Sequence, residues 1–576
     1  MVSGQGKRLR YAADEAPPPG VSVVVGLQTA VLTCVPVVVI MTIVARVAGQ
    51  SDEYLLWTIF AGLVIGGLTT IVQAARFGGI GAGNLVIMGS CGAAIGVAVL
   101  ALRAGGPPLL ATLVVASALF QFGLAARLAV LRRIFTPVVS GTLTALIAVS
   151  IMPLGFAMMQ RVPADAPAAA APVTTIVTVV TVAGLMLRAR GILLAWTPVV
   201  GLAVGTAVAA LFGILDFSRA GQVAWIGLPP LAGPGIGPVL DSRFWLLLPG
   251  FLFVTLVITV KQVGDAVLIQ RLSRREPRAT DFRRVQGAVS ACAAGTLLSG
   301  IAGTLPVWPR NGGIRLARGV GIAARSVGIH IGIIVIGLAF VPRFAVVLLS
   351  IPAPVLGAYI FVVFAANFAQ AMKVIFQSDP GRQGAFVAGI SFWVGAGIQF
   401  RAIFPEYFSG PAGQTLANGI VTGGITVLLL SLFLELTGPR RHRAEMPLGE
   451  DSLPVVDKFV MGLAERYRWR GAPLERLRAS AEEAVLSLIR QETDASAAAR
   501  GLRVVASNDR TGATLEFTAA TRGANLENEM VALGSRRPDP TSQRDLTLRL
   551  LRFHASSVSH RQYHNADILT VRVARS

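Results

Sequence analysis

Charged residues are scarce in this chain of 576 residues and make up 14% of it, whereas soluble domains contain about 25%. Hydrophobic residues account for 53%. These proportions exclude a soluble globular protein and predict membrane-spanning segments of about 20 residues each. Cysteine is also rare. Cys34, Cys91 and Cys292 lie in apolar segments without the spacing of a disulfide framework or a metal site, so we expect small buried side chains.

Acidic residues are outnumbered, at 30 against 51 lysines and arginines, which gives a net charge of +21. In a membrane protein, an excess of positive charge marks the loops that face the cytoplasm and contact the anionic lipid bilayer. No nucleic-acid partner is therefore expected. The sequence offers no nucleophile–base pair and no cluster of metal ligands. It therefore predicts neither an enzyme nor a bound cofactor or metal. Residues 1–21 lack the apolar core of a signal peptide and are expected to form a cytoplasmic tail.

The apolar part of the chain, 22–436, is predicted to be an all-α polytopic membrane domain of about fourteen transmembrane segments. Arginine and lysine gather in alternate connections, and the connection at 271–284 contains six arginines. This asymmetry predicts a multi-pass protein of the inner (plasma) membrane with both termini in the cytoplasm. The predicted segments are 22–47, 54–74, 84–102, 109–130, 136–157, 172–189, 192–213, 244–268, 285–303, 304–325, 327–342, 344–376, 383–402 and 412–436.

Two of these segments are interrupted. The tenth lies in Thr304–Gly328, TLPVWPRNGGIRLARGVGIAARSVG, and the third is rich in small residues around Ser90 and Cys91. Broken backbone at membrane depth occurs where protein or a water-filled cavity satisfies it. Paired interruptions in equivalent positions of two halves predict a 7+7 inverted repeat with a solute site between them. The alternatives are a cytoplasmic loop for the tenth segment and close helix packing through small residues for the third.

Five stretches in colinear order give the chain a family resemblance. They are VGLQTA (25–30), IVQAARFGGIGAGNLVIMGS (71–90), LRRIFTPVVSGTLTALIAVSIMPLG (131–155), ATDFRRVQGAVSACAAGTLLSGIAG (279–303) and SIPAPVLGA (350–358). Together they resemble the nucleobase–ascorbate transporter family, the xanthine/uracil permeases, over residues 20–436. The resemblance implies a core domain and a gate domain, a homodimer, and movement of a small solute by elevator-like alternating access, usually coupled to protons or sodium.

The chain departs from that family at the expected solute site. The family usually has a carboxylate in segment eight, in a pattern such as Glu-x-x-Gly-Asp, and the matching run here is KQVGD, with Lys261 in the carboxylate position and Asp265 kept. In segment ten, an ungapped comparison puts Gly312 and Gly313 on the family's Glu/Gln-Asn pair and Arg315 on its glycine. A shift of two residues would instead put Asn311 on the Asn and Gly313 on the Gly.

Lys261 is an intramembrane charge and hence a functional candidate. One interpretation is an ion pair with Asp265 at i+4 that only holds the core domain together. The other is direct contact with an anionic or acceptor-rich solute, or a role as the coupling charge, because a charged lysine donates hydrogen bonds and accepts none. Weaker solute-binding candidates are Gln28 in the first segment, Ser90 and Cys91 at the break of the third, and Trp308, which offers a flat ring or an interfacial anchor.

The charged C-terminal part is predicted to be a basic linker, 437–452, followed by a small α+β cytosolic domain, 453–576. Helices are expected at 453–468, 473–491 and 544–556, and strands at 502–507, 514–518 and 567–573. AEEAVLSLIR (481–490) and the ending DLTLRLLRF…ADILTVRV resemble the GHKL ATPase fold of anti-sigma-factor kinases. Ser487 replaces that family's metal-binding Asn, and its glycine motifs correspond to 521–523 and 545–548. The resemblance thus implies a degenerate domain without nucleotide, and His554, His560 and His564 are expected at the surface.

The predicted function is a secondary-active transporter of a small nucleobase-like or anionic solute. Two alternatives stay open at this point: an ordinary proton-coupled xanthine, urate or uracil permease, and a transporter-like sensor that signals through its tail.

Overall fold

The computed structural model describes residues 9–131, 136–190, 192–216, 225–229, 237–276, 278–378, 380–408, 413, 416–437, 441–489, 501–509, 511–519, 525–533, 543–564 and 566–575. The chain forms two compact units, which are described separately. The first comprises Met1–Arg275 and Arg284–Phe433, and the second comprises Glu276–Arg283 and Leu434–Ser576.

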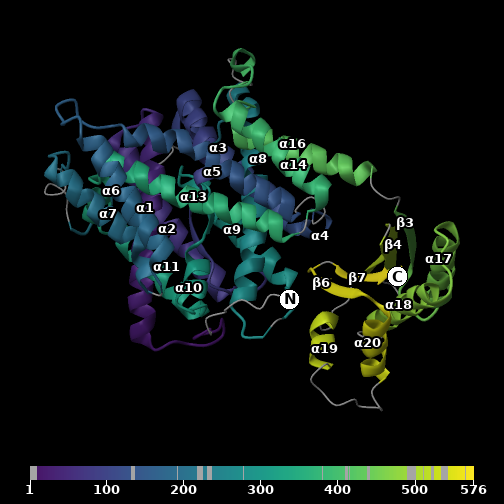
Figure 1. Ribbon diagram of the computed structural model, residues 1–576. Helices are drawn as coiled ribbons and strands as arrows, with labels where there is room; N and C mark the ends of the chain where they lie inside the picture. Colours follow the sequence, from purple (N-terminus) through teal and green to yellow (C-terminus); the bar gives the residue numbers. More distant parts are fainter. Residues whose placement is uncertain are drawn as a thin grey trace. The chain divides into compact units, whose positions relative to one another are not determined.

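The described residues of the first unit are mainly helical (Figure 1) and include two short strands. Among the described residues, eight helices are long and apolar enough to cross a membrane, or nine if the bent pair α11 and α12 forms one span. A polytopic membrane fold is therefore confirmed, and the count of fourteen segments stays a prediction. The elements are α1 (Pro19–Val47), α2 (Asp52–Ala75), β1 (Ile87–Ser90), η1 (Gly92–Ala94), α3 (Ile95–Ala126), α4 (Leu128–Leu131), α5 (Pro137–Met159), α6 (Ala170–Arg188), α7 (Ile192–Leu211), α8 (Ser242–Leu272), α9 (Phe282–Ile301), β2 (Val307–Arg310), α10 (Gly312–Gly319), α11 (Arg325–Ala339), α12 (Pro342–Leu349), α13 (Ala353–Gln377), α14 (Gly381–Gln399), η3 (Pro405–Phe408) and α16 (Gly419–Thr437).

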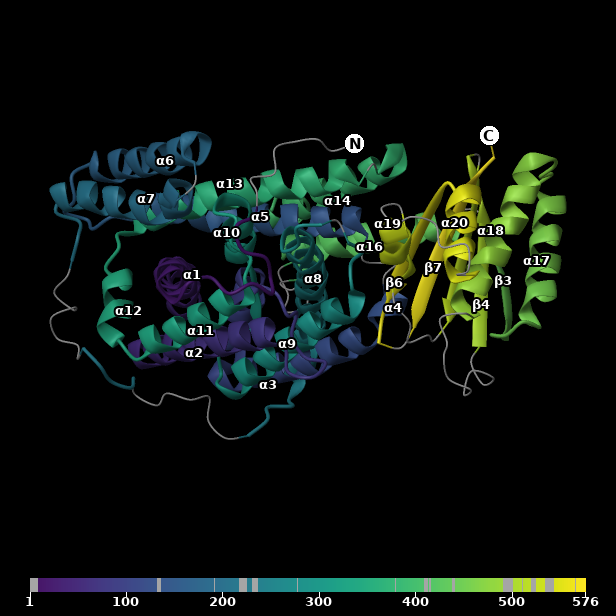
Figure 2. The ribbon, with the colours of Figure 1, turned by 90° about the horizontal axis from the view of Figure 1, so that it is seen from below.

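The helices of this unit pack as two groups, which Figure 2 separates clearly. In one group α2 lies along α11, α1 packs on both, and α3 packs along α8. In the other group α13 lies along α5, α6 packs on α7, and α14 packs on α5. Fewer contacts join the groups, mainly α5 with α8 and α10 with α7. The division places α1, α8 and α10 opposite α13.

The two predicted interruptions meet each other. β1 and β2 pair antiparallel, with Ile87 opposite Arg310 and Ser90 opposite Val307. Each strand leads directly into a helix, β1 into η1 and α3, and β2 into α10. Gly313 shows why the tenth segment needs a glycine pair, because a Cβ on it would lie 2.0 Å from the carbonyl oxygen of Leu85. The broken third and tenth segments are thus confirmed, and backbone pairing satisfies their freed polar groups as membrane depth requires.

Proline and glycine set two further breaks. The stretch predicted as one segment at 344–376 is two helices, α12 and α13, because Pro352 stands at the N-cap of α13 and has no N–H to continue a helix from α12. α11 and α12 meet at 84°. The third and fourth predicted segments meet inside α3, where Gly106 has φ +69 and Pro107 follows it.

The residues before α1, Leu9–Glu15, form a strap across this unit. The Tyr11 N–H donates to the carbonyl oxygen of Gly321 at 3.1 Å, and the Ala323 N–H donates back to the Tyr11 carbonyl at 2.9 Å. At the strap's other end Arg275, just beyond α8, binds the Glu15 carboxylate at 2.8 Å. This hydrogen bond is the main reason that the pKa of Glu15 is lowered. The strap therefore ties the end of α8 to the loop between α10 and α11.

The second unit is an α+β domain, as the sequence predicts for the tail. An antiparallel sheet of five strands has the order β3-β4-β5-β7-β6. α18 lies on β5 and β7, α17 packs beside β3, and α20 packs on α18. Alternate residues of the strands, among them Val504, Phe517 and Leu569, form one buried cluster with Leu477 and Leu488 of α18. Its elements are β3 (His442–Pro447), α17 (Ser452–Arg466), α18 (Ala472–Ile489), β4 (Gly501–Asn508), β5 (Gly512–Ala519), α19 (Leu526–Leu533), α20 (Gln543–His554), β6 (Ser557–Gln562) and β7 (Asp567–Ala574).

Two expectations for the tail are wrong. β3 lies within the predicted basic linker, and it pairs with β4 from His442 to Pro447. His560, expected at the surface, is 1% exposed, and its Nδ1 accepts a hydrogen bond from the Leu526 N–H. Burial, with a smaller effect of the Arg283 charge, lowers the pKa of His560 from 6.5 to about 4. His560 is therefore a neutral part of the core at neutral pH.

The GHKL resemblance of the tail stays a prediction. Ser487 donates its hydroxyl to the Glu483 carbonyl at 2.6 Å within α18. The predicted counterpart of the nucleotide motif, 521–523, lies outside the described residues, as does the side chain of Asp545.

The short segment Glu276–Arg283 belongs to the second unit. Its Phe282 ring lies 5.0 Å from the Tyr563 ring, measured between centroids. Arg283 lies 3.5 Å from the buried carboxylate of Asp567. A piece of the connection between α8 and α9 is therefore built into the edge of this sheet.

Candidate functional site

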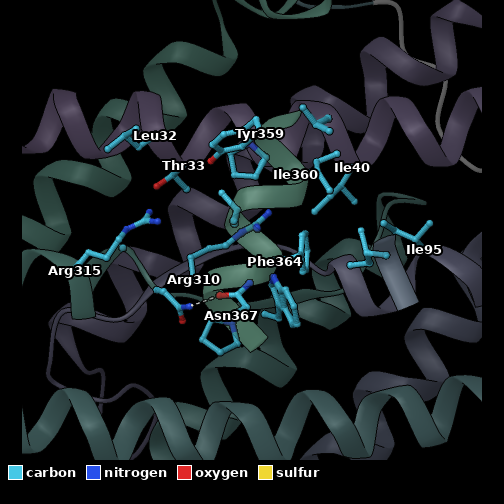
Figure 3. Close-up of a pocket in the computed structure, with 18 of the residues that line it drawn as sticks. Leu32, Thr33, Ile40, Ile95, Arg310, Arg315, Tyr359, Ile360, Phe364 and Asn367 are labelled. Carbon is cyan, nitrogen blue, oxygen red and sulfur yellow. Dashed lines mark hydrogen bonds between the residues drawn. The ribbon is translucent and has the colours of Figure 1, made fainter. Parts of the chain in front are cut away.

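A cavity opens between the two helix groups of the first unit. α1 and α13 provide most of its apolar wall, and α8, β2 and α10 provide most of its polar wall. The cavity thus lies where the interrupted tenth segment meets the facing helix α13 (Figure 3).

Lys261 projects from α8 into this polar wall and is held from three sides. Its Nζ lies 2.5 Å from Asp265 Oδ2, one turn along α8. It donates a longer hydrogen bond, at 3.5 Å, to Asn311 Oδ1 and lies 5.3 Å from the centre of the Trp308 ring. Both members of the ion pair are largely buried, with 13% and 19% of their side chains exposed. The ion pair fixes Lys261 and neutralises its charge locally.

Asn311 connects this pair to the opposite helix group. It stands at the N-cap of α10 without capping the helix through its side chain. Its amide instead donates to Asn367 Oδ1 of α13 at 3.1 Å, the dashed line in Figure 3. Gly312 follows at the first turn of α10 and also lines the cavity. The first backbone N–H groups of a helix have no partner within it and favour anionic or acceptor groups.

Arg310 is the third polar element of the wall. It ends β2 and donates from Nη2 to the carbonyl oxygen of Ser90 at 3.1 Å. Its Nε is buried and has no hydrogen-bond partner among the residues that the structure describes. In Figure 3 the side chain reaches into the space between Tyr359 and Asn367. Arg315, one turn into α10, also lines the cavity and is exposed.

The structure brings five of the ten sequence-predicted residues to the cavity: Lys261, Trp308, Asn311, Gly312 and Arg315. Asp265 stands behind them as the partner of Lys261. The other four lie outside the lining residues. Gln28 is 3% exposed, Ser90 and Cys91 are buried in the β1 break, and Gly313 packs against Leu85.

Sequence reasoning missed Arg310, Tyr359, Phe364 and Asn367, which all line the cavity. Arg310 had a usable signal, because it is a cation inside the interrupted segment itself. Asn367 had a weaker one as an amide in the apolar α13. For Tyr359 and Phe364 no local signal exists, because their role depends on α13 facing α10.

An apolar cavity with a polar wall of convergent donors, set within membrane-length helices at a pair of broken segments, defines a membrane transporter. The sequence profile of the Permease family, the xanthine/uracil permeases, matches residues 20–403, and the chain belongs to this family.

Two named permeases match this chain over nearly the whole of their own length. The uric acid permease PucJ of Bacillus subtilis is 26% identical over 438 residues, covering 73% of this chain and 93% of the relative. The xanthine permease XanP of Escherichia coli is 25% identical over 457 residues, covering 75% of this chain and 96% of the relative. These relatives are permeases, and the chain, as a member of the same family, is a membrane permease and not an enzyme.

Among solved structures, the inward-facing murine Slc26a9 anion transporter is similar in fold. The match has a TM-score of 0.50 and 14% sequence identity, and it covers 76% of this chain and 72% of that chain.

Proposed function

We propose that this permease moves a small nucleobase-like or anionic solute through the cavity between its two helix groups, by elevator-like alternating access. One observation supports the proposal most: the cavity is lined by α1, α8 and α10 on one side and by α13 on the other. A group that contains the broken segments and moves against the other group would expose this cavity to each side in turn.

Lys261 gives the proposed site its unusual character. It stands where the family resemblance leads one to expect a carboxylate, and it supplies N–H donors in place of acceptors. A neutral nucleobase presents ring N–H groups as well as carbonyl oxygens, so the exchange of a carboxylate for lysine disfavours binding through the ring N–H groups. The side chain is fixed by Asp265 and Asn311 and need not be reordered when a solute binds.

The proposal also covers the side of the membrane on which the termini lie and the oligomeric state. We propose both termini in the cytoplasm, from the arginine-rich alternate connections, and a homodimer, as the resemblance implies. Single cysteines introduced in the N-terminal strap and labelled with a membrane-impermeant reagent test the first. Crosslinking in native membranes tests the second.

The transport proposal is tested with purified protein in proteoliposomes. We expect saturable uptake of at least one labelled solute from a panel of urate, xanthine, uracil and small organic anions. Lys261→Glu is expected to weaken anion uptake and to shift selectivity towards neutral nucleobases. Binding without any flux across the panel would contradict transport and indicate a sensor.

A further inference from the structure

Three cations line the cavity, and only one of them has an acidic partner. Lys261 is paired with Asp265 at 2.5 Å. Neither Arg310 nor Arg315 has a carboxylate within 4.0 Å among the described residues, and no aspartate or glutamate is among the lining residues. With Asp265 included, the fixed charges at the cavity sum to two positive charges. The site therefore has a charge that a neutral solute leaves uncompensated.

Arg310 is the cation for which this matters most. Arg315 is exposed, but Arg310 is half-buried between the strand pair and the cavity. A guanidinium has five N–H donors, and one of them is used, by the Ser90 carbonyl. An intramembrane charge without a counter-charge is expensive. A bound anion would compensate it and would use the donors that remain.

The backbone fixes Arg310 in place. It is paired with Ile87 across the β1–β2 ladder. Its Nε passes 3.0 Å from the position that a Cβ on Gly89 would occupy, so the guanidinium crosses β1 where the strand has no side chain. Such a guanidinium loses little conformational entropy on binding, and its planar fork matches the two oxygens of a carboxylate.

A second orphan donor lies nearby. Trp308 lines the cavity and is 5% exposed, yet its indole N–H has no hydrogen-bond partner among the described residues. Indole N–H groups donate only. The polar wall thus consists mainly of donors, whereas Phe364 and Tyr359 add aromatic surface beside them. Donors next to flat aromatic surface suit a ring compound with an anionic acceptor group.

We infer that the solute is a flat ring compound that carries a carboxylate, and that Arg310 rather than Lys261 binds this negative group. This inference rests on the proposed function, since it assigns the solute class of the same cavity. Lys261 remains tied to Asp265 and forms the adjoining wall.

Uracil and orotate provide the matched test, because they share one ring and differ by a carboxylate. Equilibrium binding of both, with urate and benzoate as further anions, is measured on purified full-length protein. We expect wild-type protein to bind orotate at least about tenfold more tightly than uracil. Arg310→Gln is expected to weaken orotate binding about 10- to 100-fold, the range for a lost charge-assisted hydrogen bond, and to leave uracil within about twofold. Arg318→Gln, on the exposed side of α10, is the matched control and should change neither.

Arg310→Lys keeps the charge but loses the planar fork, so an intermediate loss of orotate binding is expected, and this variant decides the question if Arg310→Gln does not fold. Equal affinity for uracil and orotate, no binding of any of the three anions at millimolar concentration, or equal weakening of both pyrimidines by Arg310→Gln would overturn the inference. Uptake in proteoliposomes is measured in parallel. Anion binding that depends on Arg310 without uptake would retain the inference and reject the transport proposal. Uptake of uracil that Arg310→Gln leaves unaffected would retain the transport proposal and reject the inference.

Discussion

Replacing Lys261 by methionine removes the positive half of a largely buried ion pair and leaves Asp265 without its counter-charge. Removing one partner of a buried pair costs about 3–5 kcal/mol, because the other charge stays desolvated. Since 13% and 19% of the two side chains remain exposed, some hydration of Asp265 persists. We therefore expect the lower end, a loss of about 3 kcal/mol in the free energy of unfolding. Removing both charges in Lys261→Met/Asp265→Leu should restore stability to within about 1 kcal/mol of wild type.

The assay is unfolding of the full-length protein in mixed detergent–SDS micelles, followed by tryptophan fluorescence, for wild type, both single variants and the double variant. Lys373→Met, at an exposed lysine of α13, controls for the loss of any lysine. A single Lys261→Met variant as stable as wild type, or a double variant as unstable as the single one, would refute the reasoning. Because the assay measures unfolding and not solute binding, it tests the structural interpretation of Lys261 by itself.

Three further outcomes are expected. Gly313→Val should abolish the folded yield in membranes, because even its Cβ would lie 2.0 Å from the Leu85 carbonyl oxygen; well-folded variant protein would contradict the close approach of α10 to β1. His560 has a folded pKa of about 4 against 6.5 unfolded, so its contribution to stability is fully present above pH 6.5 and is lost, by about 3 kcal/mol, as the pH falls to 4. Hydrogen exchange of β6 in the intact protein, corrected for the intrinsic pH effect, should show this loss, and an unchanged pH dependence in His560→Gln would argue against it. Glu15→Gln should weaken the hold of Arg275 and speed hydrogen exchange across the N-terminal strap, and unchanged exchange there would mean that the backbone bonds to Gly321 suffice.

The breaks in the fold could be predicted from the sequence because their cause is local. Pro306 and Pro309, on either side of Trp308, lack the backbone N–H that an apolar helix needs in order to continue. The same is true of Lys261 and Asp265, whose spacing along one helix is enough to bring them together. Helices and strands of the tail also follow from residue periodicity, which is why most of them were predicted close to their observed bounds.

What the sequence could not show depends on pairing between distant segments. Arg310 becomes a cavity residue because β2 pairs with β1 and fixes the direction of its side chain. Tyr359 and Asn367 join the site because α13 faces α10. β3 was expected to be part of a linker, since it belongs to the basic run that follows the last apolar segment, and only its pairing with β4 makes it part of the sheet. His560 looked like a surface residue for the same reason, as its burial comes from β6 lying against α19.

The assignment of Glu276–Arg283 to the second unit has a practical consequence for dissecting the protein. Residues on both sides of this segment belong to the first unit, so the chain passes between the units three times and not once. Cutting the chain after Phe433 would remove Tyr563 and Asp567, the partners of Phe282 and Arg283, and leave an unpaired aromatic ring and cation at the start of α9. A truncated protein with altered transport would thus report on two changes at once. Substitutions at the Phe282–Tyr563 contact within the full chain are the cleaner way to learn what the tail does.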